Sequence, residues 1–238
     1  MSDFDHMNMR DQTTQAQAQQ IDVGLRIYMS KVYNHMAIGL LATALTAYFG
    51  AASGLYLAIA QTPFIWLLIF APLGMVFWLS ARMHKMSASK ARTLFYTYAG
   101  ITGLSLSAVF ITFTGESITT TFLVTAGAFG ALSLYGYTTK RDLSAYRSFL
   151  FMGLIGLILA MVVNLFMQNS ALQFAVSVIG VLIFAGLTAY DTQAIKQIYY
   201  AADTREVAEK KTIFGALRLY LDFLNMFLFL LQFIGNRE

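Results

Sequence analysis

The sequence contains no cysteine, which excludes disulfide bonds, thiolate metal sites and cysteine nucleophiles. Charged residues are also scarce, at 12% of the chain, where a soluble domain carries about twice that share. Hydrophobic residues make up 58%, and the mean hydropathy is +0.61. So little polar surface cannot cover a folded chain in water. We therefore predict an integral membrane protein whose surroundings are the lipid bilayer.

The net charge of +4 does not indicate a nucleic-acid partner, because the basic residues lie in short segments between apolar runs. The N-terminal segment is polar, with a Gln/Thr-rich tract over residues 11–20 and no apolar core of the kind found in signal peptides. We predict that residues 1–25 form a disordered cytosolic tail and that residues 26–238 form the membrane domain.

Seven apolar runs follow the tail, and each is near the twenty residues or so that a helix needs to cross the hydrocarbon core. Lipid offers no partner to backbone N–H and C=O groups, so spanning segments of this length must be helical. The fold class is therefore an all-α bundle of seven transmembrane helices. The runs cover residues 32–51, 64–80, 94–113, 118–137, 148–167, 171–190 and 213–233.

Lys and Arg gather in alternate connections between these runs, and the other connections (residues 52–63, 114–117 and 168–170) contain neither. By the positive-inside rule the basic connections are cytosolic, so the N-terminus is cytosolic and seven spans place the C-terminus in the periplasm. A re-entrant seventh run would instead return the C-terminus to the cytosol. The basic residues of the N-terminal segment and of the basic connections are Arg10, Arg26, Lys31, Arg82, Lys85, Lys90, Arg92, Lys140, Arg141, Arg147, Lys196, Arg205, Lys210 and Lys211.

Two carboxylates interrupt the apolar runs. Placing an ionisable group inside the membrane costs free energy, so such residues usually have a functional role. Asp191 ends the sixth run, and Asp222 lies inside the seventh, nine residues past Ile213 and therefore about 13 Å deep. Asn225 shares a helix face with Asp222 and is expected to support it. If the sixth helix continues through Asp191, the two carboxylates meet, share a proton and bind a hard cation such as Ca²⁺ when ionised.

Simpler interpretations of these charges stay open. Asp191 can merely mark the cytosolic end of its helix. Arg218 precedes Asp222 by four residues, so a private ion pair within one helix would satisfy Asp222. Arg82, after the second run, either reaches an aspartate or anchors the helix in the lipid headgroups. The three histidines are scattered and form no ligand pattern, so we expect no cofactor.

An intramembrane aspartyl protease is the enzyme class that comes nearest to this pattern. Such enzymes use two membrane-embedded aspartates, and Tyr190-Asp191 matches one half of their motif. The other half requires Gly-x-Gly-Asp, whereas Asp222 follows Leu-Tyr-Leu. We therefore predict that the protein is not an enzyme.

Four stretches resemble the Bax inhibitor-1 family, also called the transmembrane Bax inhibitor motif family, in its bacterial form. Together they cover most of the chain from the second run to the C-terminus. The loop sequence TTKRDLS and the sequence LYLDF are the specific parts. The stretches are residues 103–110 (GLSLSAVF), 129–144 (FGALSLYGYTTKRDLS), 189–196 (AYDTQAIK) and 219–227 (LYLDFLNMF).

The resemblance implies a seven-helix bundle with the last helix at its centre. It also implies a pH-sensitive calcium leak of the bacterial cytoplasmic membrane, with a pore gated by an aspartate pair whose positions match Asp191 and Asp222. In the family an arginine at the cytosolic end of the second helix can latch one aspartate. Here Ser80 falls nearer that position and Arg82 is two residues further on, so Arg218 is the other candidate for this role.

The resemblance leaves a second function open. Some bacterial relatives bind and modulate a membrane-bound AAA protease, and eukaryotic relatives suppress cell death. A membrane regulator that transports nothing, acting through such a protease or a stress-response partner, is therefore the alternative to a leak channel. No residue pattern in the chain identifies that partner.

Overall fold

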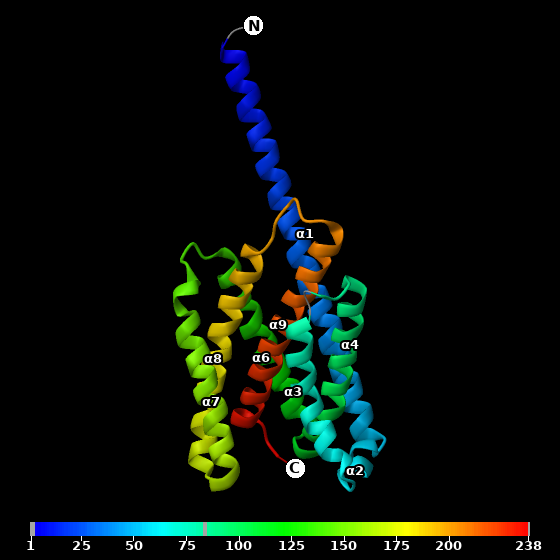
Figure 1. Ribbon diagram of the computed structural model, residues 1–238. Helices are drawn as coiled ribbons and strands as arrows, with labels where there is room; N and C mark the ends of the chain where they lie inside the picture. The colour runs from blue at the N-terminus through cyan, green and yellow to red at the C-terminus, as the bar shows by residue number, and fades with distance from the viewer. Residues whose placement is uncertain (1–2, 83–84, 238) are drawn as a thin grey trace.

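The computed structural model describes the backbone of residues 3–82 and 85–237 and the side chains of residues 22–82 and 85–237. Within these residues, seven helices are long and apolar enough to span a membrane, which confirms the predicted all-α bundle (Figure 1). The helices are α1 (Asp3–Ala52), α2 (Leu55–Ala60), α3 (Phe64–Arg82), α4 (Ala88–Ser105), α5 (Ser107–Thr112), α6 (Gly115–Thr138), the 3-10 helix η2 (Leu143–Tyr146), α7 (Arg147–Met167), α8 (Ser170–Gln197) and α9 (Arg205–Ile234).

Four spanning helices begin at a residue whose side chain caps the first turn. Ser87, Thr114, Asn169 and Thr204 each accept a hydrogen bond from the backbone N–H three residues later, at 3.0–3.4 Å. These bonds satisfy N–H groups that have no partner within the helix. The capping residues therefore fix where α4, α6, α8 and α9 start.

Helix α9 occupies the centre of the bundle and packs against α1, α4, α6 and α8. In its most apolar stretch 67% of the residues are buried, against at most 33% in any other span. On the opposite side of the bundle from α8, the Tyr220 hydroxyl lies 2.7 Å from Thr43 Oγ1, and Thr43 donates to the Ala99 carbonyl at 2.9 Å. These bonds tie α9 to α1 and α4, as a central last helix requires.

Helix α9 is continuous, so it is not the re-entrant pair considered from the sequence. The two ends of the chain consequently lie at opposite ends of the bundle (Figure 1). At the C-terminal end the Thr114 N–H donates to the Asn236 carbonyl at 3.2 Å, and the Asn236 N–H donates to Ser117 Oγ at 2.9 Å. These bonds fasten the end of the chain to the connection between α5 and α6.

Helix α1 begins at Asp3 and projects beyond the bundle (Figure 1), over the residues for which the sequence predicts a cytosolic tail. Residues 3–23 contain neither proline nor glycine, and five of the 21 are glutamine, which has good helix propensity. They continue a helix that the membrane span nucleates, so propagation adds one hydrogen bond for each residue without a new nucleation step.

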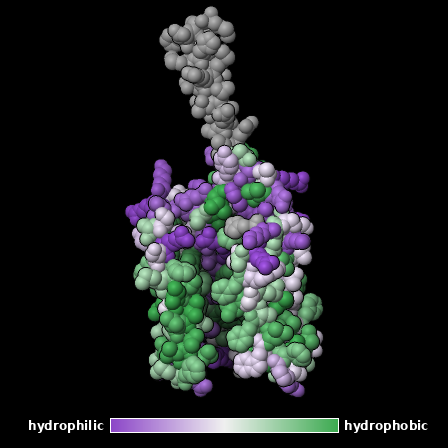
Figure 2. Space-filling model, in the orientation of Figure 1, coloured by the Kyte–Doolittle hydropathy of each residue, from purple (hydrophilic) through white to green (hydrophobic). Residues whose placement is uncertain are grey.

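The surface of the bundle is a hydrophobic band below a hydrophilic end (Figure 2). The band includes α3 and α7, whose apolar stretches are only 6% and 11% buried. Phe149 and Phe166 on α7 are 73% and 85% exposed. Large apolar side chains on this scale are stable only in contact with lipid, which agrees with the composition of the chain.

The glycines of the spanning helices fall into two groups. A Cβ at Gly103 of α4 would collide with the backbone of Thr43 on α1, and one at Gly136 of α6 would collide with the backbone of Ala189 on α8. At Gly127 and Gly130 a Cβ would meet no described atom within 4 Å. Close helix approach therefore depends on Gly103 and Gly136, although small-residue spacing in the sequence points to Gly127 and Gly130 as well.

A Gly136→Ala substitution is expected to destabilise the protein by about 1–3 kcal/mol, because backbone atoms of α8 cannot move aside for the methyl group. Gly127→Ala is the matched control, and it should be neutral or stabilising by up to about 1 kcal/mol, since alanine favours a helix. Thermal unfolding in detergent micelles compares the two variants. Equal stability of both would show that α6 and α8 do not need this contact.

Candidate functional site

Asp191 and Asp222 lie on the two helices that pack most extensively, α8 and α9. Helix α8 continues six residues beyond Asp191, to Gln197, so Asp191 does not mark a helix end. Asp191 and Asp222 are both buried residues, with 6% and 4% of their whole-residue surfaces exposed. The interpretation of Asp191 as a helix-end residue is therefore wrong, because the helix extends past the apolar run.

Arg218 pairs with Asp191 across the α8–α9 interface. Its Nε donates to Asp191 Oδ2 at 3.1 Å, and its Nη2 donates to Asp191 Oδ1. The private Arg218–Asp222 pair considered from the sequence is not the ion pair that forms. Long side chains on a helix point back toward its N-terminus, so the Arg218 guanidinium extends away from Asp222, which follows it in α9.

The Asp222 carboxyl group lies beside that of Asp191, within reach of a hydrogen bond when one of the two carries a proton. Asp222 Oδ2 is buried and, among the described residues, has no hydrogen-bond partner. The structure thus brings together two carboxyl groups and one guanidinium. The cluster has a net charge of −1 with both carboxyls ionised and is neutral with one proton bound.

The other two residues expected at this site lie apart from the carboxyl pair. Asn225 Nδ2 donates to the Leu221 carbonyl at 2.8 Å, so its amide is used within α9 and is not directed to Asp222. Arg82 is exposed at the end of α3, a helix that packs mainly on α4, and within the described part of the chain it forms no ion pair. The arginine at the aspartates is therefore Arg218.

The polar residues that follow Asp191 anchor the end of α8 to the connection between α6 and α7. Gln193 accepts from the Leu143 N–H and donates to the Arg141 carbonyl, both at 2.8 Å. Lys196 donates to the Tyr137 carbonyl at 2.9 Å. No role for Gln193 follows from the sequence alone, although a glutamine beside an apolar run indicates a buried hydrogen bond. These bonds fix the position of Asp191.

One face of α9 is only half-buried although the helix is central. It carries Phe214, Arg218, Leu221, Asn225 and Leu228, which recur at helical spacing. Figure 2 shows a hollow in the surface between α8 and α3, and α9 lies behind this hollow in Figure 1. The side chain of Arg218 is 30% exposed and the side chain of Asp191 only 8%, so the guanidinium lies on the outer side of the ion pair.

The carboxyl pair provides too few ligands for a tight metal site. Among the described residues no group of three or more His, Cys, Asp or Glu side chains comes together. Calcium takes six to eight oxygen ligands in stable sites. Two ionised carboxylates can attract such an ion but supply only part of its ligand shell.

Comparison with known proteins agrees with this architecture. The family described as Inhibitor of apoptosis-promoting Bax1 matches residues 25–238. Inner membrane protein YbhL of Escherichia coli is 50% identical over 219 residues, which cover 90% of this chain and 94% of YbhL. Relatives from Rickettsia prowazekii and Caulobacter vibrioides are 48% and 43% identical over 95% and 100% of this chain, and over 96% and 100% of their own lengths. The chain therefore belongs to the Bax inhibitor-1 family.

Proposed function

We propose that the protein is a pH-sensitive leak for calcium or other cations in the bacterial cytoplasmic membrane, gated by Asp191 and Asp222. The observation that carries this proposal is the buried pair of carboxyl groups next to a single guanidinium. Ionisable groups at this depth typically belong to ion or proton pathways. The name of the relative YbhL, an inner membrane protein, supports the location.

The charge of the cluster provides the gating mechanism. With one proton bound, the two carboxyl groups and Arg218 sum to zero, so nothing at this depth attracts a cation. When that proton leaves, the net charge becomes −1, and a divalent cation is attracted to carboxylate oxygens that water does not screen. Arg218 competes with the cation for Asp191, because the same oxygens accept its two hydrogen bonds.

Buried hydroxyl groups on α6 supply a polar route between the carboxyl pair and the far end of the bundle. Ser117, Thr121, Thr125 and Ser133 recur at multiples of four residues, and all are buried. Thr192, the neighbour of Asp191, donates to Ser133 Oγ at 3.3 Å. Phe129 interrupts the row, and its ring lies 5.4 Å from that of Phe223 on α9. We propose that this aromatic pair closes the route in the present conformation.

Calcium flux into proteoliposomes tests the proposal directly. The purified protein is expected to admit calcium faster than protein-free liposomes, at a rate that changes with pH because the carboxyl pair exchanges a proton. Liposomes that contain a heat-inactivated sample control for leakage caused by reconstitution. Flux equal to this control at every pH would contradict the leak and favour a regulator that transports nothing.

The same geometry supports a function other than catalysis. In an aspartyl protease the two carboxyl groups share one proton and together hold the attacking water molecule. Both groups must therefore be free of other partners. Here the oxygens of Asp191 accept hydrogen bonds from Arg218. A peptide carbonyl has no such access to the pair while this ion pair is formed.

The cytosolic side of the protein is proposed to be the end that carries the connections between α3 and α4, α6 and α7, and α8 and α9, where Lys and Arg are concentrated. Because the chain has no native cysteine, single substitutions can be labelled selectively. In intact cells an impermeant thiol reagent should modify Ser53→Cys but not Ser89→Cys, both of which are exposed positions. The reverse pattern would invert the topology.

A further inference from the structure

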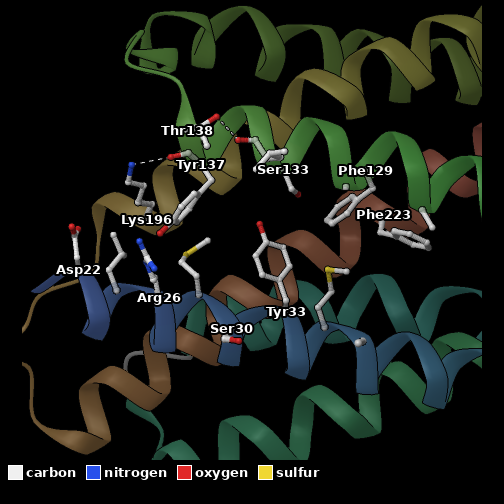
Figure 3. A pocket seen from close by; sticks show the side chains of 17 residues that line it. Asp22, Arg26, Ser30, Tyr33, Phe129, Ser133, Tyr137, Thr138, Lys196 and Phe223 are labelled. Atoms are coloured by element: carbon white, nitrogen blue, oxygen red, sulfur yellow. Dashed lines mark hydrogen bonds between the residues drawn. The ribbon is translucent and has the colours of Figure 1, made fainter. Parts of the chain in front are cut away.

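A crevice with a volume of about 1000 Å³ lies between α1 and α6, with residues of α8 and α9 at its back. Figure 3 shows Tyr33 of α1 directed into the space toward α6. The volume is at the upper end of the range for small-molecule sites, which is about 300–1000 Å³. The crevice is distinct from the hollow over Arg218, because neither aspartate of the pair lines it.

The two ends of the crevice differ in polarity. Arg26 of α1 and Lys196 of α8 lie at one end, together with the exposed Asp22 (Figure 3). Phe129 and Phe223 lie at the other end. The crevice is therefore amphipathic along its length, with a mouth that carries a net charge of +1 and an apolar interior.

The crevice opens toward the lipid. On its α6 side Gly130 and Leu134 are exposed, and on its α1 side Ser30 and Ala37 are exposed. Both helices span the membrane, so the molecules that reach this opening are those of the bilayer. An acyl chain matches the apolar end of the crevice, which Phe129 and Phe223 line.

The charge at the mouth selects among lipids. Within the described part of the chain neither Arg26 nor Lys196 forms an ion pair with a carboxylate. The Lys196 ammonium donates one hydrogen bond to the Tyr137 carbonyl, which leaves two of its three N–H donors for another acceptor. An arginine and a lysine at the headgroup level are typical of sites for anionic lipids.

We infer that the crevice binds one anionic phospholipid from the leaflet at the basic end of the bundle. Its phosphate group lies between Arg26 and Lys196, and an acyl chain runs past Tyr33 to Phe129 and Phe223. The exposed Asp22 carboxylate faces a headgroup hydroxyl, which can donate to it. The site does not depend on the proposed leak, since lipid binding requires no ion flux.

Native mass spectrometry of the full-length protein in detergent tests this site. Phosphatidylglycerol is expected to bind more tightly than phosphatidylcholine with the same acyl chains, and glycerol phosphate without chains is expected not to bind. Combined Arg26→Gln and Lys196→Gln substitutions should weaken phosphatidylglycerol binding about thirtyfold. Lys90→Gln with Lys140→Gln is the matched control, because both are exposed cations at the basic end of the bundle and neither lines the crevice.

A steric variant tests the same crevice without changing charge. Gly130 lines the crevice, and a Cβ there meets no described atom within 4 Å, so Gly130→Leu fills the space without disturbing the helices. This substitution should weaken lipid binding at least about tenfold. Gly127→Leu is the control, because a Cβ at Gly127 also meets no described atom within 4 Å but the residue lies outside the crevice, and it should leave lipid binding unchanged. Unchanged binding in Gly130→Leu would overturn the inference even if the charge variant fails to fold.

Three other results would also overturn the site. Equal weakening by the control lysine pair would mean that binding follows overall charge. Equal affinity for phosphatidylcholine would remove the role of Arg26 and Lys196. Tight binding of glycerol phosphate alone would indicate a site for a soluble anion.

Discussion

An Asp222→Asn variant is expected to pass calcium at a rate that no longer responds to pH. Asparagine has nearly the same shape as aspartate but cannot exchange a proton in this range. The substitution is well tolerated sterically, since Asp222 Oδ2 has no partner among the described residues and the new amide can donate to Asp191. Between about pH 6 and about pH 8 the flux should vary less than about twofold, because the variant lacks one of the two carboxyl groups that share the proton.

The measurement is calcium uptake into proteoliposomes, with the variant and the native protein reconstituted at equal density. Asp142→Asn is the matched control. Asp142 lies outside the spanning helices, and the Ser144 N–H that donates to its side chain at 2.9 Å lowers the pKa of this carboxyl. It is therefore ionised above its ordinary pKa and titrates only in more acid solution. The control should keep the native pH response.

Two outcomes would contradict the aspartate gate. If Asp222→Asn retained the full pH response, the titrating group would lie elsewhere in the chain. If the Asp142→Asn control lost the response as completely as Asp222→Asn, the effect would not be specific to the buried pair.

An Arg218→Gln variant should be the least stable of the polar substitutions at this site. Removal of one partner from a buried ion pair leaves an uncompensated charge and costs about 3–5 kcal/mol. The Arg218 side chain is 30% exposed, so water offsets part of this cost and we expect a loss of about 2–3 kcal/mol. Thermal or chemical unfolding in detergent micelles measures the loss.

The same variant should leak calcium faster than the native protein under conditions in which the native protein is closed. Arg218 competes with a cation for the Asp191 oxygens, and its removal frees them. A gain of about tenfold corresponds to about 1.4 kcal/mol of lost competition. Proteoliposome flux at the pH of lowest native activity provides the readout.

Two further variants separate this ion pair from unspecific effects. Adding Asp191→Asn to Arg218→Gln removes the uncompensated charge and should restore much of the stability. Arg92→Gln breaks the exposed Arg92–Glu209 pair, at 3.2 Å, and should cost less than about 1 kcal/mol. Equal losses of stability in Arg92→Gln and Arg218→Gln would mean that burial of the Arg218–Asp191 pair does not increase its contribution to stability.

Much of the site could be predicted because ionisable residues are conspicuous in apolar sequence. Asp191 and Asp222 interrupt runs that otherwise span the membrane, and the cost of burying each charge marks it for attention. The arginine partner was harder to assign. The sequence was compatible with Arg82, with Arg218 or with neither as the partner. It shows which side chains share a face of one helix, but not which side chains of different helices are in contact.

The sequence by itself determined the seven spans, since hydrophobic length and the need to satisfy backbone hydrogen bonds in lipid act within each segment. Only the tertiary structure decided that Arg218 binds Asp191, that Gly136 is pressed against Ala189, and that a crevice separates α1 from α6. Each of these depends on how far neighbouring helices are rotated and shifted against one another. That arrangement is set by packing among many side chains at once, which no local pattern encodes.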